Sequence, residues 1–207
     1  AHDILESENI FVMTEYRAMH QNIRPLNLLI LNLMPTKIVT ETQLLRMLSN
    51  TPLQIQVDFL QTASYTSTHT DIHHLQQFYY TFDQIRNRRY DGMIITGAPL
   101  DYVPCEETLY WDEVCKIMEW SKTHVHCTFH LCWGAYAGLY YHYGIEKLDM
   151  PKKLFGIYSH EIRKETSPLF RGFNDNFLAP HSRATDVRLS DVEAIPELEV
   201  MAVTETG

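Results

Sequence analysis

The chain has 207 residues and a mass of 24.3 kDa, and its 26 acidic and 17 basic side chains give a formal net charge of -9. Hydrophobic residues make up 45% and aromatic residues 12%, which excludes a disordered chain and predicts one compact globular protein. No run approaches the ~18 apolar residues that a membrane span needs, and no secretion signal opens the chain. We therefore expect a cytoplasmic protein with no membrane partner, and the acidic charge also disfavours nucleic acid.

The four cysteines predict neither disulfides nor a metal site. A chain of this size with a full set of apolar residues needs no disulfides, and no pair of cysteines has CxxC spacing. We interpret all four as reduced thiols and expect no bound metal; they are Cys105, Cys115, Cys127 and Cys132.

The first half of the chain alternates strand and helix signals. Residues 1–26 are expected to form an N-terminal arm packed on the domain, and Leu26–Leu33 a buried strand. Thr40 and Gln43 stand at capping-box spacing ahead of a leucine-rich helix. The alternation then continues through Ile55–Leu60 (strand), Asp71–Tyr80 (helix), Gly92–Thr96 (strand), the helix of Trp111, Val114, Cys115 and Met118, Thr128–Leu131 (strand) and Gly134–Tyr143 (helix). This order predicts an α/β fold with a parallel, doubly wound sheet.

The second half is less regular. Leu154–Tyr158 and Val200–Thr204 have strand character, whereas Phe170–Ser182 is expected to be a long loop or an irregular insert. No repeat or linker interrupts the sequence, so we expect a single α/β domain over residues 1–207.

Three loops are candidates for a site, because ligands of parallel α/β sheets bind at the carboxyl ends of the strands. They are Asn32–Thr36, Thr96–Asp101 and His130–Gly134. Gly97-Ala98-Pro99 forms a tight turn that lets backbone donors approach a ligand, although a plain structural turn explains it nearly as well. An acidic Asp101 at the crevice would repel an anionic substrate tail, and a solvated loop aspartate is the alternative.

The third loop has the context of a nucleophile elbow. Cys132 ends a buried strand, and Gly134 and a helix rich in small residues follow at once. A thiol there is exposed at a helix amino end, which favours the thiolate, and the backbone N–H of Trp133 would stabilise an oxyanion. The alternative is a core cysteine, which is our interpretation for the other three cysteines.

Histidines near these loops are candidate proton acceptors. His130 lies two residues before Cys132, His181 lies beside Ser182, and His160 is followed by Glu161. Each histidine alone is more often a structural or surface residue than a base. The arginine-rich segment at residues 86–89 is most simply a solvated helix end, with phosphate binding as a minority alternative.

Taken together, several stretches resemble one family, the homoserine O-acyltransferases of methionine biosynthesis (homoserine transsuccinylase, MetA type). The matching stretches run in order from about Phe11 to the end. They are NIRPLNLLILNLMPTKIVTETQLLRMLSNTPLQ, FYYTFDQIRNRRYDGMIITGAPLDYV, YWDEVCKIMEWSKTHV, the Cys132-Trp133 turn, YGIEK, KKLFGIY and RGFNDNFLAPHSR.

The resemblance implies a class I glutamine-amidotransferase-like fold with Cys132 as the acyl-accepting nucleophile. It also implies that Lys153 and Ser182 contact the amino-acid substrate and that Asp101 stands at the acyl-group discriminator. In the family, glycine there goes with succinyl-CoA and glutamate with acetyl-CoA, and charge repulsion puts aspartate on the acetyl side.

The implied activity is acetyl transfer from acetyl-CoA to L-homoserine through a cysteine thioester, with no bound cofactor. The backbone N–H groups of Ala98 and Trp133 would hold the oxyanion. L-serine, as in cysteine biosynthesis, is one methylene shorter and stays open as acceptor, because such a difference is worth only ~1 to 3 kcal/mol. Succinyl-CoA is the alternative donor.

The family's catalytic histidine and glutamate lie in a Gly-His-Pro-Glu-Tyr type motif, which does not occur before Thr206-Gly207. We therefore expect the chain to be part of a longer protein. A glutaminase-like thiol hydrolase and a non-catalytic binding protein are the rival classes. The N-terminal arm offers a surface on which two copies could form a homodimer.

Overall fold

The computed structural model describes residues 2–14, 16, 20, 23–65 and 70–204. Contacts divide the chain into two compact units. Unit 1 comprises Ala1–Pro99 and Pro104–Ala135, and unit 2 comprises Leu100–Val103 and Tyr136–Gly207. The single α/β domain over residues 1–207 stays a prediction.

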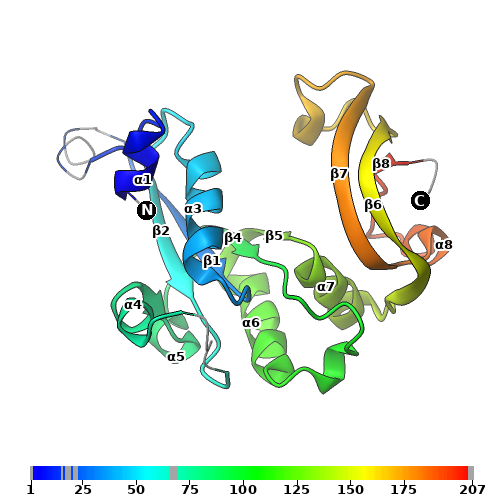
Figure 1. Ribbon diagram of the computed structural model, residues 1–207, viewed down its shortest axis with the longest axis horizontal. Coiled ribbons are helices and arrows are strands. Elements are labelled where there is room, and N and C mark those ends of the chain that lie inside the picture. The colour runs from blue at the N-terminus through cyan, green and yellow to red at the C-terminus, as the bar shows by residue number, and fades with distance from the viewer. Residues whose placement is uncertain (1, 15, 17–19, 21–22, 66–69, 205–207) are drawn as a thin grey trace. The chain divides into compact units, whose positions relative to one another are not determined.

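Unit 1 is built on a five-stranded parallel sheet with the order β3-β2-β1-β4-β5 (Figure 1). The chain winds outward from β1 through β2 to β3, then returns to the other side of β1 for β4 and β5. This reversal confirms the predicted doubly wound sheet and puts its switch point between β1 and β4. The strands are β1 Leu26–Leu31, β2 Ile55–Leu60, β3 Tyr79–Tyr80, β4 Tyr90–Ile95 and β5 Val125–His130.

The sheet is buried on both faces around β1. Leu29, Ile30 and Leu31 are all 0% exposed, although successive strand side chains point to opposite faces. On one face, Ile30 packs in a cluster with Phe59 of β2 and with Leu75. The continuous apolar run of β1 therefore reflects helices or loops on both sides of the sheet.

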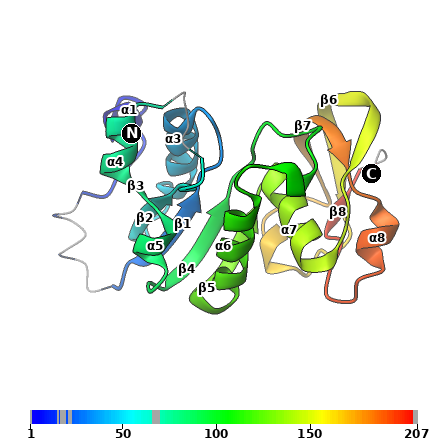
Figure 2. The same ribbon diagram turned by 90° about the horizontal axis from the view of Figure 1, so that it is seen from below.

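The helices of unit 1 follow the predicted order with shifted ends. They are α1 His2–Ser7, α3 Lys37–Leu48, α4 Ile72–Phe78, α5 Phe82–Ile85, the 3-10 helix η1 Cys105–Glu107, α6 Trp111–His124 and the start of α7 Trp133–Tyr143. The longest, α6, packs beside β5 (Figure 2). Within the described part of the chain, no helix is both long enough and apolar enough to cross a membrane.

Two local predictions in this unit are wrong. The predicted capping box of Thr40 and Gln43 is absent, because α3 begins earlier with Thr36 as its N-cap, so Thr40 lies inside the helix. The helix expected over Asp71–Tyr80 ends at Phe78, because Tyr79 and Tyr80 pair with β2 as strand β3. Asp71 caps the helix, accepting a hydrogen bond from the His73 N–H.

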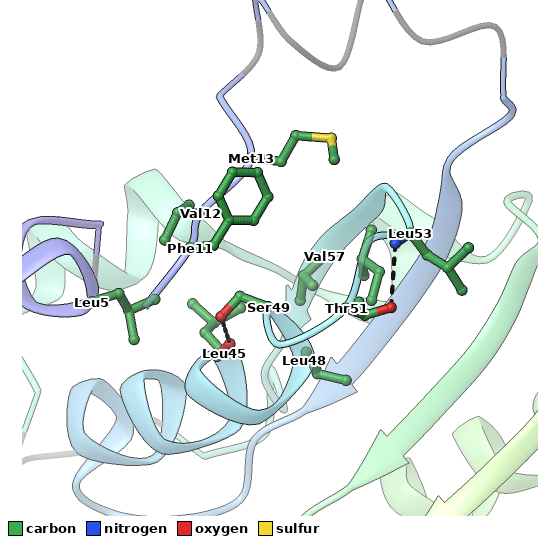
Figure 3. Close-up of a pocket in the computed structure, with 11 residues that line it drawn as sticks. Leu5, Phe11, Val12, Met13, Leu45, Leu48, Ser49, Thr51, Leu53 and Val57 are labelled. Atoms are coloured by element: carbon green, nitrogen blue, oxygen red, sulfur yellow. Dashed lines mark hydrogen bonds between the residues drawn. The ribbon is translucent and has the colours of Figure 1, made fainter. Parts of the chain in front are cut away.

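The N-terminal arm packs against α3 and β2. Leu5 of α1 is 3% exposed, and Glu8 accepts two hydrogen bonds from the Arg46 guanidinium at 2.5 and 2.6 Å. Phe11 and Val12 lie over Leu45 at an open, mainly apolar cavity of about 240 Å³ (Figure 3). The arm therefore covers the end of the sheet where strands begin, opposite the predicted site loops.

Unit 2 contains a three-stranded antiparallel sheet with the order β7-β6-β8. The strands are β6 Leu148–Ile162, β7 Asn176–Asp186 and β8 Ala202–Val203, and the unit also holds most of α7, the 3-10 helix η2 Pro168–Phe170 and α8 Leu189–Glu193. The loop predicted over Phe170–Ser182 is therefore wrong from Asn176 onward. Pro180 lies within β7, which is an edge strand, where a residue without an N–H is tolerated.

Asp91 ties the segment before β1 to β4. The Arg24 guanidinium donates to both of its carboxylate oxygens at 2.7 and 2.9 Å, and the Asn27 N–H donates at 2.8 Å. These donors, Arg24 first, lower the pKa of Asp91 to about 2 from its ordinary value of 3.8. The ionised carboxylate therefore stabilises the fold at neutral pH.

We predict that Asp91→Asn lowers the melting temperature at pH 7 and that the difference from the unchanged protein disappears on acidification. A lowered pKa adds stability above about pH 4, and this is lost as pH falls towards about 2. Thermal unfolding at pH 7, 4 and 2 measures this. A difference in melting temperature that stays constant from pH 7 to pH 2 would contradict the stabilising role of the ionised Asp91 carboxylate.

Candidate active site

The three predicted loops meet at the carboxyl edge of the unit 1 sheet. Leu31, Ile95 and His130 end their strands in one row across β1, β4 and β5. Beyond this row, the Leu33 N–H donates to the Thr96 hydroxyl at 2.8 Å. The first loop is thereby fixed to the second at the switch point, where parallel α/β sheets form their ligand crevice.

The third loop packs directly on the second through Gly97. A Cβ built on Gly97 would lie 2.9 Å from the Cys132 Cβ and 3.2 Å from its Sγ. The absence of a side chain at position 97 is therefore what allows the Cys132 side chain to occupy this place. A close approach of this kind requires glycine.

Cys132 has the strained backbone of a nucleophile elbow. Its φ is 53°, a left-handed conformation that is uncommon for a residue with a side chain, and the residue is exposed. The turn is enforced by Gly134, where an added Cβ would lie 2.7 Å from the Thr96 carbonyl oxygen. The prediction of a sharp strand-turn-helix at this cysteine is confirmed.

The elbow leads into α7, which has eleven residues. The Ala135 N–H donates to the Cys132 carbonyl at 2.9 Å. The Trp133 N–H belongs to the first turn, whose donors no helix carbonyl satisfies, and it is therefore available to a ligand. The Trp133 ring is 2% exposed and packs edge-on against Tyr110, so the turn is anchored in the core. An exposed cysteine beside the first turn of a helix is an arrangement suited to acyl transfer.

His130 positions this turn. Its Nδ1 bonds the Gly134 carbonyl at 3.0 Å, which makes Nδ1 the protonated nitrogen. Burial lowers the pKa of His130, so the ring is neutral at physiological pH. Of the alternatives left open for this histidine, the geometry supports the structural one.

Two of the three remaining cysteines differ from the core positions expected for them. Cys105 is buried, as predicted, whereas Cys115 is only partly buried and Cys127 is exposed on the edge strand β5. The core prediction for Cys127 is wrong because β5 pairs on one side only. Burial raises the pKa of the Cys115 thiol to about 11, which makes it a poor nucleophile.

The sequence reasoning missed a buried polar group at the same edge, around Lys37. The Lys37 ammonium is 6% exposed and donates to the Asn32 carbonyl, directly beyond β1. Burial lowers the pKa of Lys37 to about 8. The signal in the sequence was a lysine directly after the first candidate loop, Asn32–Thr36, and a lysine so placed with a shifted pKa is a functional-site candidate.

The substrate-contacting residues implied by resemblance lie in unit 2. Ser182 pairs directly opposite Phe155 in the β6–β7 ladder, and both side chains are exposed on the same face. Lys153 is exposed on β6 and lies within the register irregularity between Asp149 and Leu154, so strand pairing does not assign its side chain to a face. Asp101 also belongs to unit 2. The meeting of these three with Cys132 in one site stays a prediction.

The other candidate histidines pair with each other. Nε2 of His181 lies 2.9 Å from Nε2 of His160, so one ring donates and the other accepts. Burial and the nearby Arg183 lower the pKa of His181. Glu161, the neighbour suggested by sequence, points to the opposite face of the ladder.

Neither metal nor phosphate chemistry finds support among the described residues. No group of three or more His, Cys, Asp or Glu side chains there could hold a metal ion. The arginines of residues 86–89 have protein partners: Asp83 for Arg86, Asp58 for Arg88 and the Thr123 carbonyl for Arg89.

We predict that Gly97→Ala slows modification of Cys132 by a disulfide reagent about 100-fold, because the new methyl group would displace the sulfur. The expected loss of stability is about 1–3 kcal/mol. Gly144→Ala is the control for general destabilisation, since its positive φ of 69° makes alanine strained there while no atom lies within 4 Å of the added methyl group. Equal thiol reactivity in the two variants would contradict the proposed packing.

Comparisons with known proteins agree with the observed fold. Over 89% of the chain, the fold resembles a crystal structure from Thermoplasma acidophilum that is provisionally described as a GMP synthase component, at a TM-score of 0.58 and 14% identity. The resemblance covers 76% of that chain and concerns the fold alone.

Curated relatives are much closer in sequence. Proteins named homoserine O-acetyltransferase from Agathobacter rectalis, Bacillus licheniformis and Bacillus subtilis are 58%, 56% and 53% identical over 98–99% of this chain. The chain covers 66–68% of their length, about two thirds. All of residues 1–207 match the homoserine O-succinyltransferase (HTS) family. The chain therefore belongs to the homoserine O-succinyltransferase family.

Proposed function

We propose that the protein transfers an acetyl group from acetyl-CoA to the hydroxyl of L-homoserine, in methionine biosynthesis, through a thioester on Cys132. The observation that carries this proposal is the exposed sulfur at a left-handed elbow, held between Gly97 and α7. Relatives at 53–58% identity named homoserine O-acetyltransferase supply the substrate classes.

In the first step, the Cys132 thiolate attacks the thioester carbonyl of acetyl-CoA. The new S–C bond forms, the bond to the CoA sulfur breaks, and CoA leaves as a thiolate. The backbone N–H groups of Ala98 and Trp133 stabilise the oxyanion between these events. Ala98 is 5% exposed, beside the Gly97 turn, which supports a water-poor surrounding for this charge.

In the second step, the homoserine hydroxyl attacks the acetyl-cysteine. Its proton passes to a general base, which the family resemblance assigns to a histidine beyond Gly207, and Cys132 is released as thiolate. Lys153 and Ser182 bind the amino acid; both are exposed, on the paired strands β6 and β7, which supports a joint role. No bound cofactor takes part.

We predict that incubation with acetyl-CoA adds one acetyl group to the intact protein and that peptide mass spectrometry finds it on Cys132. Cys132→Ser should remain unmodified. Cys127→Ser is the matched control, because Cys127 is also exposed but lies within a strand. An unmodified Cys132 in the folded protein, or acetylation that requires Cys127, would contradict the proposal.

The choice of acetyl-CoA over succinyl-CoA depends on Asp101. Its carboxylate would repel the free carboxylate of a succinyl group and leave an acetyl group unaffected. We predict that Asp101→Gly raises the kcat/KM ratio of succinyl-CoA to acetyl-CoA about tenfold or more, whereas the charge-preserving Asp101→Glu leaves it low. Steady-state kinetics with both donors measures this; an unchanged ratio in Asp101→Gly would remove Asp101 from donor selection.

A further inference from the structure

A buried polar network adjoins the switch point of the unit 1 sheet, and the transfer reaction proposed above does not use it. The network consists of Asn32, Lys37, Glu41, His74 and Tyr79, which come from the loop after β1, from α3, α4 and β3. Asn32 is 0%, Glu41 5% and both Lys37 and Tyr79 6% exposed. Such complete burial of two opposite charges is uncommon and requires specific partners.

Tyr79 is the centre of this network. Its hydroxyl donates to Glu41 Oε1 at 2.6 Å and accepts from Asn32 Nδ2 at 2.8 Å. The Lys37 ammonium lies 5.4 Å from the centre of the Tyr79 ring. His74 Nε2 lies 3.0 and 3.1 Å from the two oxygens of the Glu41 carboxylate. One tyrosine thus links the acid, the amide and the cation.

The neighbouring Glu41 carboxylate favours the charged form of Lys37 although the residue is buried. Burial lowers the pKa of Lys37 and the Glu41 carboxylate raises it, leaving it at about 8. Burial and Glu41 together raise the pKa of Tyr79, which therefore stays a hydrogen-bond donor. Removal of the tyrosine hydroxyl would leave Glu41 and Asn32 with one buried partner fewer each.

The network is well placed to act on the site. Asn32 follows β1 on one side of the switch point, and Cys132 follows β5 on the other side, with only β4 between these strands. Two strand spacings correspond to about 10 Å. The Lys37 ammonium bonds the Asn32 carbonyl at the end of β1, and a positive charge there attracts a polyanionic acyl donor to the carboxyl edge of the sheet. The position of this charge depends on the groups that hold it.

We propose that Tyr79 and Glu41 are positioning residues that hold the Lys37 ammonium at the switch point, where it favours reaction of the anionic acyl donor with Cys132. The inference rests on the proposed function. If the network only stabilised the fold, apolar side chains would do so equally well. A polar network in which every group is hydrogen-bonded also fixes a cation in one place.

The test is a double-mutant cycle on the rate at which acetyl-CoA acetylates Cys132. Lys37→Met is expected to slow acetylation about 100-fold and Tyr79→Phe about tenfold, since Phe keeps the ring and loses the hydroxyl. If Tyr79 acts through Lys37, Tyr79→Phe has no further effect in the Lys37→Met protein. If the rate losses of Lys37→Met and Tyr79→Phe multiply in the double variant, the proposal is wrong. It is also wrong if Tyr79→Phe acetylates at the unchanged rate.

Tyr90→Phe is the matched control. The Tyr90 hydroxyl also donates to a carboxylate, Asp58, at 2.8 Å, but it lies at the start of β4. This variant should acetylate at the unchanged rate, with a comparable loss in melting temperature. If Tyr90→Phe slows acetylation as much as Tyr79→Phe, the effect of Tyr79 is general destabilisation and the proposal fails.

Glu41→Gln gives a second readout that needs no change at Tyr79. The groups that face Lys37 are Glu41, Tyr79 and Asn32, and His74 acts through Glu41. Loss of the carboxylate lowers the pKa of Lys37 further, so the alkaline fall in acetylation rate should move to lower pH. If the alkaline fall in acetylation rate stays at the same pH in Glu41→Gln, the inference is wrong. If the unchanged protein is not acetylated at all, the proposed function itself is wrong.

Discussion

The close packing of backbone on backbone at the ends of β4 and β5 is the constraint on which the site depends. Gly134 leaves no room for a side chain against the Ile95 and Thr96 carbonyls, and Gly97 leaves none against Cys132. Between these two contacts the chain turns at Cys132 with φ at 53°. The strain of this turn is maintained by the surrounding sheet, which keeps the sulfur exposed at the beginning of α7.

Much of the fold followed from periodicity, because parallel strands buried on both faces and amphipathic helices leave strong local signals. Ile55–Leu60 was predicted with its observed bounds. Failures arose where tertiary pairing decided the outcome. Tyr79 and Tyr80 continue a helical pattern, yet β2 offers them a free edge. The second half of the loop expected over Phe170–Ser182 pairs with β6 as the edge strand β7. No local signal reports whether such an edge exists.

The site was predictable to a similar extent. The elbow was visible because strand, Cys132, Gly134 and small helix residues adjoin in sequence. The roles of Lys153 and Ser182 came from resemblance alone, and that of Asp101 came from its charge together with the resemblance. Lys37 was missed because its importance comes from burial beside Tyr79, which is 42 positions further along the chain. His130 and His181 were ambiguous because a histidine's partners are set by the fold: His130 bonds the Gly134 carbonyl and His181 pairs with His160.

The central claim is that the Cys132 sulfur carries the acyl group between two small molecules. The most direct measurement is a chase: the protein is loaded with labelled acetyl-CoA, free CoA is removed, and L-homoserine is added. The account predicts that label leaves Cys132 at the rate at which O-acetylhomoserine appears, in equal amounts. Label that stays on Cys132, or product formed without its loss, would contradict the account.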